Sequence, residues 1–169
     1  MSTVERVEVH VFKFAVENMS LGTSRAAGVG NVIYEAGATW EAHKIALKIA
    51  CDDGAQGEYV THWVGTPSTL GQMKMLAPHL LGRDPEQREL IYDDLKRDIR
   101  AYDHMGHGPI DIALWDLAGK KYGVSVSKML GGFRAALPTY ASTYIGQDEP
   151  GGLDSPEAYA EYAQACKER

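Results

Sequence analysis

The segment from His107 to Gly132, with the sequence HGPIDIALWDLAGKKYGVSVSKMLGG, constrains the fold more than any other part of the chain. Pro109 suits the first turn of a helix, where its missing N–H costs nothing, and Gly123 is a natural end. We therefore predict a helix over 109–122, with Gly108 as its N-cap. Apolar residues cover most of its circumference, which is typical of a buried helix: Ile110, Ile112, Ala113, Leu114, Trp115, Leu117 and Ala118.

Two carboxylates, Asp111 and Asp116, belong to this predicted helix. A carboxylate with little access to water needs a hydrogen-bond donor or a cation beside it. Lys120 follows Asp116 by four residues, which places the two side chains on the same helix face. A second short turn is predicted from Ser127 to Leu130, just before Gly131-Gly132.

Alternating apolar residues predict strands in the first part of the chain. From Val4 to Phe14, Val7, Val9 and Val11 share one face, and His10 lies on the other face as an exposed strand residue rather than a ligand. A second strand is predicted from His43 to Cys51, and a turn at Asp52-Asp53-Gly54 leads into an antiparallel strand over 58–61. In the second strand, one face is predicted to point inward and the other outward. The inward side chains are Ile45, Leu47, Ile49 and Cys51, and the outward ones are Lys44 and Lys48.

Helices follow the strands. Thr66 and Pro67 open a helix whose apolar stripe consists of Leu70, Met73, Ala77 and Leu80. Asp84 and Pro85 begin another helix that extends to about Tyr102, with Ile91, Leu95, Ile99 and Tyr102 on its inner face. Strands followed by helices predict an α+β domain, with the helices packed on one face of a three-stranded antiparallel sheet.

The segment from Glu17 to Thr39 is rich in Gly, Ser, Ala and Asn. A loop of this length inside a compact domain is usually a functional lid or disordered. Asn31 to Tyr34 could pair as a strand. Gly28-Val29-Gly30 does not predict a nucleotide-binding loop, because Ile33 stands where the third glycine would fall and no helix follows.

The pattern changes after Gly132. Leu137 to Tyr144 is predicted as a strand, and Ser155-Pro156 opens a helix that carries Tyr159, Tyr162 and Cys166. One strand and one helix make a single β/α unit that lacks a neighbour to pair with. We expect this unit to associate with other chains, so that the protein is a homo-oligomer.

Composition excludes several classes of function. The net charge of −6 and the absence of a Lys/Arg cluster argue against nucleic-acid binding. No apolar run approaches ~20 residues, and Met1 to Phe14 shows no signal-peptide core, so we expect a cytoplasmic protein without a membrane partner. Cys51 and Cys166 are far apart and have no CxxC spacing, and both are interpreted as reduced residues.

The run IDIALWDLAGKKYGVSVSKMLGG resembles the motif that ends the N-terminal capping domain in the mandelate racemase and muconate lactonizing enzyme group of the enolase superfamily. The helix, the Trp-Asp pair, the Gly-Lys pair and the closing Leu-Gly-Gly occur in the same order. The resemblance implies an enolase N-terminal-domain-like fold, a sheet with a helical bundle, over 1–132. It implies that 133–169 are the first β/α unit of an incomplete TIM barrel, a fold of ~250 residues. The chain departs from the pattern at Gln56-Gly57-Glu58, where a Trp often precedes the Gly-Glu.

The resemblance also implies a reaction. Family members use a divalent cation, usually magnesium, to stabilise the enediolate formed when the proton α to a carboxylate is removed; Lys or His bases are the general pattern of this superfamily. The metal ligands and catalytic lysines lie on later barrel strands, so we expect no catalytic or metal-binding residue in this chain. The carboxylates Asp52-Asp53 are interpreted as a turn and Asp93-Asp94 as a solvated helix face. His104 and His107, beside Asp103, are interpreted as a capping or hydrogen-bonding site rather than half a zinc site.

In the family, the loop after the first strand and the segment after the third close over the barrel mouth and exclude water. They correspond here to Glu17–Ala38 and Val60–Ser68. Arg25 could pair with a substrate carboxylate. The substrate-binding candidates are Arg25, Tyr34, Tyr59, His62 and Trp63, with Ser142 and Tyr144 near the end of the first barrel strand.

Two functions remain open at this point. The first is the capping part of a magnesium-dependent lyase (a dehydratase) or an isomerase (a racemase) that acts on a small carboxylate, a hydroxy acid or an acid sugar; these 169 residues alone would be inactive. The second is a free-standing, non-catalytic α+β binding or interaction domain. A finished domain of that kind would end near Gly132, so the strand and helix beyond it favour the first function.

Overall fold

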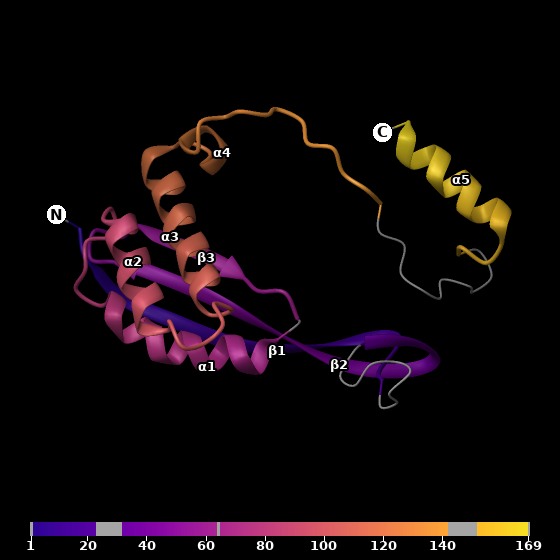
Figure 1. Cartoon of the computed structure of the whole chain (residues 1–169), viewed down its shortest axis with the longest axis horizontal. Helices are drawn as coiled ribbons and strands as arrows, with labels where there is room; N and C mark the ends of the chain where they lie inside the picture. Colours follow the sequence, from indigo (N-terminus) through magenta and orange to yellow (C-terminus); the bar gives the residue numbers. More distant parts are fainter. Residues whose placement is uncertain (1, 23–31, 64, 142–151, 169) are drawn as a thin grey trace. The chain divides into compact units, whose positions relative to one another are not determined.

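The computed structural model describes residues 2–22, 32–63, 65–141 and 152–168 (Figure 1). Its strands come first and its helices follow, which confirms the α+β class. The strands are β1 (Val4–Leu21), β2 (Val32–Cys51) and β3 (Gln56–Val60). The helices are α1 (Thr66–Leu76), the 3-10 helix η1 (Ala77–Leu80), α2 (Arg88–Asp98), α3 (His107–Tyr122), α4 (Val126–Met129) and α5 (Pro156–Lys167).

The described chain forms two compact units. One unit consists of Met1–Phe14 and Ala42–Phe133, and contains the first part of β1, the last part of β2, β3 and helices α1 to α4. The other consists of Ala15–Glu41 and Arg134–Arg169. The hydrophobic core and the candidate site described below belong to the first unit.

The three strands form one antiparallel sheet in the order β1-β2-β3. Lys48 of β2 lies opposite Glu58 of β3, and the connecting turn has Gly54 at a φ of 86°, a left-handed conformation that favours glycine. The prediction of this hairpin is confirmed. The inward face of β2 is also confirmed, because Ile45, Leu47, Ile49 and Cys51 are all at most 4% exposed.

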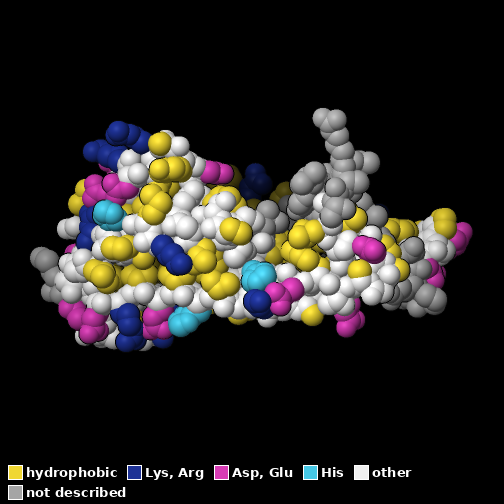
Figure 2. All heavy atoms as spheres, turned by 90° about the horizontal axis from the view of Figure 1, so that it is seen from below, with side chains coloured by type: hydrophobic (Ala, Val, Ile, Leu, Met, Phe, Trp, Pro, Cys, Tyr) yellow, Lys and Arg dark blue, Asp and Glu magenta, His cyan; other side chains and the backbone are white. Residues whose placement is uncertain are grey.

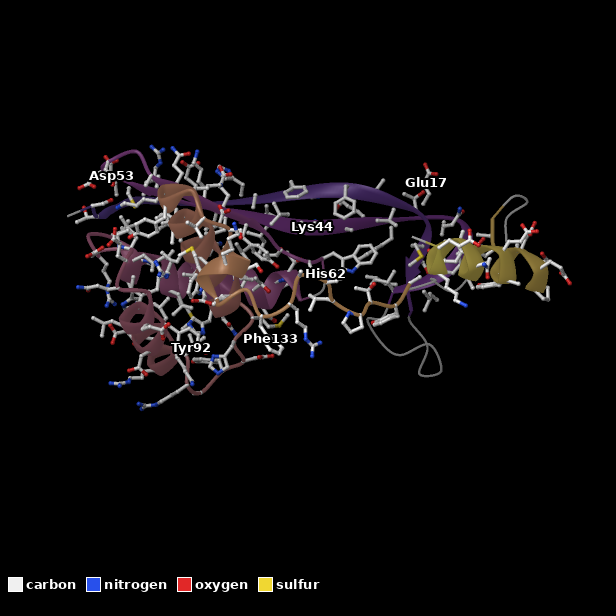
Figure 3. The ribbon with its side chains drawn as sticks, turned by 90° about the horizontal axis from the view of Figure 1, so that it is seen from above. Glu17, Lys44, Asp53, His62, Tyr92 and Phe133 are labelled. Atoms are coloured by element: carbon white, nitrogen blue, oxygen red, sulfur yellow. The ribbon has the colours of Figure 1, made fainter. Side chains whose placement is uncertain are left out.

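The helices of the first unit lie on one face of the sheet (Figures 1 and 3). Their inner faces complete the core with Met73, Leu76, Leu80, Ile91, Leu95, Ile99, Ile110, Leu114 and Leu117, each at most 1% exposed. In β1, Val7 and Val9 pack against this core, whereas Val11, which was predicted to share their strand face, is 45% exposed.

Helix α3 packs directly on β3 at Gly57. A Cβ atom on Gly57 would lie 2.0 Å from the carbonyl oxygen of Ala113 and 2.6 Å from Cβ of Leu117, so glycine permits this close approach. The helix ends at Gly123 with a φ of 64°, as predicted. It begins at His107 with Gly106 as its N-cap, two residues earlier than predicted, and its outer side is not buried, since Ile112 is 43% exposed.

The helix predicted from Asp84 begins later. Asp84 Oδ1 accepts a hydrogen bond from the Glu86 N–H (2.9 Å), and its carbonyl accepts one from the Gln87 N–H (3.2 Å). Because the side chain bonds two residues ahead, Asp84 forms a turn instead of an N-cap, and α2 starts at Arg88. Its C-terminus is at Asp98, and Tyr102 is 59% exposed, so the predicted extension was wrong.

The expectation of a long loop after the first strand was wrong for its described parts. Strand β1 continues to Leu21, and β2 already begins at Val32. Asn18 adopts a φ of 56° and its Oδ1 accepts a hydrogen bond from the Gly37 N–H (2.9 Å). Asn and Gly tolerate such conformations, so strand pairing prevails over a composition that suggests a loop. Gly28-Val29-Gly30 lies outside the described residues.

The strand predicted from Leu137 is not formed over its described part, 137–141. A strand is stable only when its backbone N–H and C=O groups pair with a neighbour, and no described strand pairs with this segment. Residues 142–144 lie outside the described residues. Helix α5 is formed as predicted, and Ser155 caps it by accepting the Ala158 N–H at Oγ (3.1 Å).

Candidate functional site

The structure brings two of the seven predicted substrate-binding residues together. His62 and Trp63 follow β3 directly. Tyr34 belongs to β2 in the other unit, and Tyr59 lies opposite Leu47 with its partly buried side chain packed against the core. Three candidates lie outside the described residues: Arg25, Ser142 and Tyr144.

His62 and Trp63 gather with two residues of the sheet, Phe14 and Lys44; we call these four residues the Trp63 cluster. The rings of Phe14 and Trp63 are nearly parallel, 4° apart, with their centroids separated by 6.5 Å. The His62 ring meets Trp63 edge-on at 5.6 Å, and Lys44 Nζ lies 5.5 Å from the Phe14 centroid. Figure 3 labels two of these four residues, Lys44 and His62.

The backbone after β3 is tied to β2, which fixes Trp63 relative to the sheet. Thr61 accepts the Ile45 N–H at Oγ1 (3.0 Å), and its own N–H donates to the Ile45 carbonyl (2.9 Å). The Thr66 hydroxyl is shared between the carbonyls of His43 (2.8 Å) and Trp63 (2.9 Å). These threonines are buried, so the bonds are shielded from water and the segment between them is anchored at both ends.

This geometry combines two nearly parallel aromatic rings with a cation and an imidazole. The separation of the ring centroids falls within the range of favourable aromatic pairs. A Lys ammonium over a ring is attracted to the ring face, and it can still donate hydrogen bonds to an anion. The cluster is therefore chemically suited to a ligand that has both an apolar face and a negative or hydroxyl-bearing group.

A second polar group joins α3 to β3. Asp116 accepts the Glu58 N–H (2.8 Å) and pairs with Lys120 Nζ (2.7 Å), and Lys120 also reaches Glu58 Oε2 (3.2 Å). The hydrogen bonds that Lys120 donates to Asp116 and Glu58 raise the pKa of Lys120. The predicted Asp116–Lys120 pair is confirmed, and its role is to hold the helix on the sheet.

The His104–His107 pair lies at the start of α3. The His104 carbonyl accepts the N–H groups of His107 (3.2 Å) and Gly108 (3.3 Å), and Asp103 Oδ1 accepts the His104 N–H (2.6 Å). These bonds hold the helix junction through backbone atoms and the Asp103 carboxylate, whereas the buried Nε2 of His107 has no hydrogen-bond partner. His107 is 3% exposed, and burial, followed by the nearby charges of His104 and Lys96, lowers its pKa.

On the face drawn in Figure 2, basic and acidic side chains are interspersed, so this face carries no extended basic patch. Within the described residues, no helix has both the length and the apolar character needed to cross a membrane.

The N-terminal domain model of the mandelate racemase / muconate lactonizing enzyme family matches residues 32–131. The chain belongs to this family. The matched residues include Lys44, His62 and Trp63 of the Trp63 cluster and the whole of α3. It also confirms the resemblance carried by the Trp-Asp, Gly-Lys and Leu-Gly-Gly motifs.

Relatives of this family member include two curated enzymes. D-galactarolactone cycloisomerase of Agrobacterium fabrum is 32% identical over 134 residues, covering 73% of this chain and 35% of the enzyme. L-talarate/galactarate dehydratase of Salmonella typhimurium is 31% identical over 103 residues, covering 57% of this chain and 26% of the enzyme. The chain thus spans about a third of the first relative and a quarter of the second.

Solved structures share the fold. The crystal structure of D-glucarate dehydratase from Agrobacterium tumefaciens, complexed with magnesium, superposes with a TM-score of 0.68 at 27% identity. The superposition covers 96% of this chain and 41% of that chain. This confirms the enolase N-terminal-domain-like fold of the family member.

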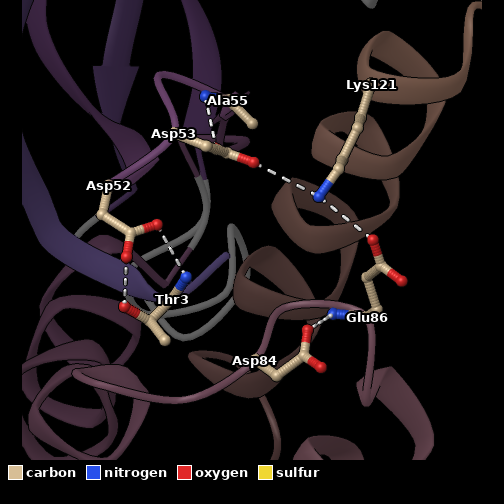
Figure 4. Close-up of polar contacts among 7 residues, drawn as sticks. All are labelled: Thr3, Asp52, Asp53, Ala55, Asp84, Glu86 and Lys121. Carbon is tan, nitrogen blue, oxygen red and sulfur yellow. Dashed lines mark hydrogen bonds and ion pairs between the residues drawn. The ribbon is translucent and has the colours of Figure 1, made fainter. Parts of the chain in front are cut away.

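The carboxylates that the sequence offers as metal ligands have other partners (Figure 4). Asp52 accepts the Thr3 N–H and hydroxyl (both 2.9 Å), and Asp53 accepts the Ala55 N–H (3.0 Å) and pairs with Lys121 (3.4 Å). Asp93 pairs with Arg97, and Asp94 with Arg83 (2.8 Å). In the described ranges, no three His, Cys, Asp or Glu residues are grouped to hold a metal. These carboxylates therefore do not fit the role of magnesium ligands.

Sequence reasoning found half of the Trp63 cluster. His62 and Trp63 were identified because the segment after the third strand contributes to the cap in the family. Phe14 and Lys44 were missed, because an alternating strand assigns them to the outer face and such residues are read as solvated. Phe14 and Lys44 both occupy outward-facing positions in neighbouring strands. This alternation, which places the two side chains on the same face of the sheet, is the signal that could have identified them.

Proposed function

We propose that this chain is the N-terminal, substrate-capping part of a metal-dependent enolase-superfamily enzyme, a dehydratase or an isomerase that removes the α-proton of a sugar acid or hydroxy acid. The observation that carries the proposal is the family match over 32–131, and two relatives are named for galactarolactone and for talarate/galactarate. L-talarate dehydratase from Polaromonas, with 22% identity to this chain, was crystallised with Mg and L-glucarate.

The role proposed for 1–132 is to enclose the substrate. The Trp63 cluster supplies an apolar surface, a cation and an imidazole at the segment after β3. A cap of this kind excludes water from the reacting centre, which strengthens electrostatic interactions there, and it orients the substrate carboxylate. Tyr34, Arg25, Ser142 and Tyr144 remain proposed substrate contacts on the same family argument; Tyr59 is a weaker candidate because it packs against the core.

The catalytic groups are proposed to lie in a (β/α) barrel whose first unit corresponds to 133–169. When bound, the family's magnesium stabilises the negative charge that develops on the substrate carboxylate. Asp52, Asp53 and Asp94 are engaged in turns and ion pairs, which supports our proposal that the polypeptide 1–169 has no α-proton exchange activity by itself. A cytoplasmic location is part of the same proposal and would be checked by fractionation.

The proposal is tested with the gene product that continues in frame beyond codon 169. The purified protein, supplied with Mg²⁺, is incubated in D₂O with a panel of aldonic acids, aldaric acids and mandelate. Exchange of the α-proton, followed by ¹H NMR, reports proton abstraction whether the enzyme dehydrates or isomerises its substrate. We expect exchange for at least one sugar acid and none with 1–169 alone.

Two results would overturn this function. If the reading frame stops at Arg169, the alternative of a free-standing α+β binding domain replaces it. If the longer protein exchanges no α-proton on any acid of the panel, it does not catalyse the proposed proton abstraction.

A further inference from the structure

We propose that Lys44 binds a carboxylate of a sugar acid, and that the Phe14 and Trp63 rings receive the carbon chain of the same ligand. The inference rests on the proposed function, because it names the ligand class and the specificity-determining residue of the cap. Lys44 belongs to β2 and Phe14 to β1, so the sheet itself, and not only the segment after β3, would contact the substrate.

Lys44 is placed to attract an anion. Its side chain is partly buried, and its Nζ lies 5.5 Å from the Phe14 centroid. Within the described part of the chain, Lys44 forms no ion pair, in contrast to Lys120 and Lys121, which each reach two carboxylates. Because the aromatic ring displaces water from one side of the ammonium, a carboxylate arriving on the open side interacts more strongly than it would with a fully hydrated lysine.

Two partly buried aromatic rings lie beside this cation. Phe14 and Trp63 are parallel within 4°, and the carbonyl of Trp63 is held by the Thr66 hydroxyl. A rigid surface loses little conformational entropy when a ligand binds. A polyhydroxy acid presents C–H groups on one side of its chain, which can pack on the rings, while its hydroxyl groups stay available to His62 and to water.

The composition of the cluster favours a carboxylate over a phosphate group. Phosphate sites usually combine several cations or an Arg fork with backbone N–H groups, whereas this cluster holds one lysine and one histidine. The chain as a whole carries a net charge of −6, which weakens the attraction for multiply charged anions.

The test is an NMR titration of the 1–169 chain. The indole N–H signal of Trp63 is assigned by its loss in Trp63→Phe, with Trp40 and Trp115 as internal references. Galactarate and galactonate are the acidic probes, and galactitol is the neutral probe with the same carbon chain. We expect saturable shifts of the Trp63 signal with both acids, a Kd in the millimolar range, and no saturation with galactitol. Raising ionic strength to about 0.15 M should weaken the acid binding, because an exposed ion pair is screened.

The variants separate a specific contact from general charge. Lys44→Gln should raise the Kd for galactonate about tenfold, the loss of one charge-assisted contact, and Lys44→Arg should recover most of the affinity. Lys48→Gln is the matched control, because Lys48 lies on the same face of the same strand, four residues away, and its replacement removes the same charge. The Kd of this variant for galactonate should stay within about twofold of the wild-type value. Unchanged signals outside the cluster in Lys44→Gln show that the variant folds.

The other outcomes would contradict either the role of Lys44 or the proposed sugar-acid function. The role of Lys44 would be overturned by equal Kd values for Lys44→Gln and wild type, by an equal loss in Lys48→Gln, or by binding of galactitol as tight as that of galactonate. It would also be overturned if neither the sugar acids nor benzoate nor inorganic phosphate gave saturable shifts. If benzoate or inorganic phosphate binds in a Lys44-dependent way and the sugar acids do not, the anion site stands and the sugar-acid function fails.

Discussion

Two adjacent lysines in the last turn of α3 connect this helix to different parts of the first unit. Lys120 pairs with Asp116 and Glu58, whereas Lys121 reaches Glu86 (3.0 Å) and Asp53 (3.4 Å). Hydrogen bonds to these carboxylates raise the pKa of both lysines. Cations in the last turn of a helix also interact favourably with the helix dipole, so Lys120 and Lys121 both stabilise the C-terminus of α3.

Asp111 is the carboxylate of α3 whose environment remains unfavourable to charge. Burial, followed by the nearby Glu89, raises its pKa, and the Arg88 charge only partly opposes this. Arg88 instead lies over the Trp115 ring, 4.5 Å from its centroid, with a buried Nε that has no hydrogen-bond partner. The sequence predicted that Asp111 needs a partner, and the structure offers only this partial one.

Replacing the buried His107 should change how stability depends on pH. Its pKa in the folded chain is lowered from 6.5, mainly by burial, so below about pH 6.5 the unfolded chain binds more protons than the folded one. Wild type should therefore lose stability as pH falls from about 6.5 toward the lowered pKa, by up to about 1 kcal/mol per pH unit, and His107→Gln should lack this loss. Urea unfolding at several pH values, followed by circular dichroism, measures both curves.

The control for this experiment is His10→Gln, since His10 is exposed on β1 and pairs with Glu8 (3.1 Å). Its curve should follow that of wild type. If the wild-type and His107→Gln curves run parallel between pH 5 and 7, protonation of His107 is not coupled to folding.

At the scale of the elements, the contact between α3 and β3 depends on Gly57. Gly57→Ala should destabilise the chain by about 2–4 kcal/mol, because a Cβ 2.0 Å from the Ala113 oxygen forces the helix away from the strand. Gly71→Ala is the matched control: Gly71 is exposed inside α1 with no atom within 4 Å of an added Cβ, and the change should be neutral or stabilising by up to about 1 kcal/mol. Chemical denaturation of the three proteins decides; equal midpoints for both variants would contradict this packing.

Core positions could be predicted from the sequence because they repeat with the period of their element. The inner faces of β2, α2 and α3 were found from alternation or from i, i+3 and i+4 spacing. Element ends were predicted less well, since they depend on local competition. Asp84 bonds into a turn instead of capping α2, and pairing between β1 and β2 extends both strands through residues whose composition suggests a loop.

The candidate site illustrates the same limit at the level of side chains. His62 and Trp63 lie in one segment, which a family motif can locate. Phe14 and Lys44 join them only through the register of neighbouring strands, and a single sequence does not specify which outward-facing residues of different strands meet. The Glu58–Asp116 bond between β3 and α3 was missed for the same reason.

For the whole chain, we predict no stoichiometric magnesium site. Asp52, Asp53 and Asp94 already accept hydrogen bonds or pair with cations, and an oxygen-rich metal site needs several convergent carboxylates. Isothermal titration calorimetry of 1–169 with MgCl₂ should show only weak, unsaturable heats. Saturation at one ion per chain with a submillimolar Kd, reversed by EDTA, would contradict the assignment of the metal to the barrel.

The segment after α4 leaves apolar side chains uncovered. Phe133 and Tyr140 are each 89% exposed and Leu137 is 69% exposed, while α5 has no buried residue and its Tyr159 and Tyr162 are each 40% exposed. Proteins in water seldom leave such surface without a covering partner, and backbone groups of an unpaired strand-forming segment invite pairing with another chain.

We therefore predict that 1–169 self-associates through 133–169. Size-exclusion chromatography with light scattering should give a mass above the 18.5 kDa of one chain, and deletion of 133–169 should return the protein toward a monomer. Leu137→Lys with Tyr140→Lys is the milder test: it places charge on the segment without removing α5 and should also weaken association, because pairing would bury both ammonium groups. If 1–169 is monomeric at tens of micromolar, these side chains are covered within one chain. Deletion of 133–169 should then lower the stability of the remaining unit and leave its oligomeric state unchanged.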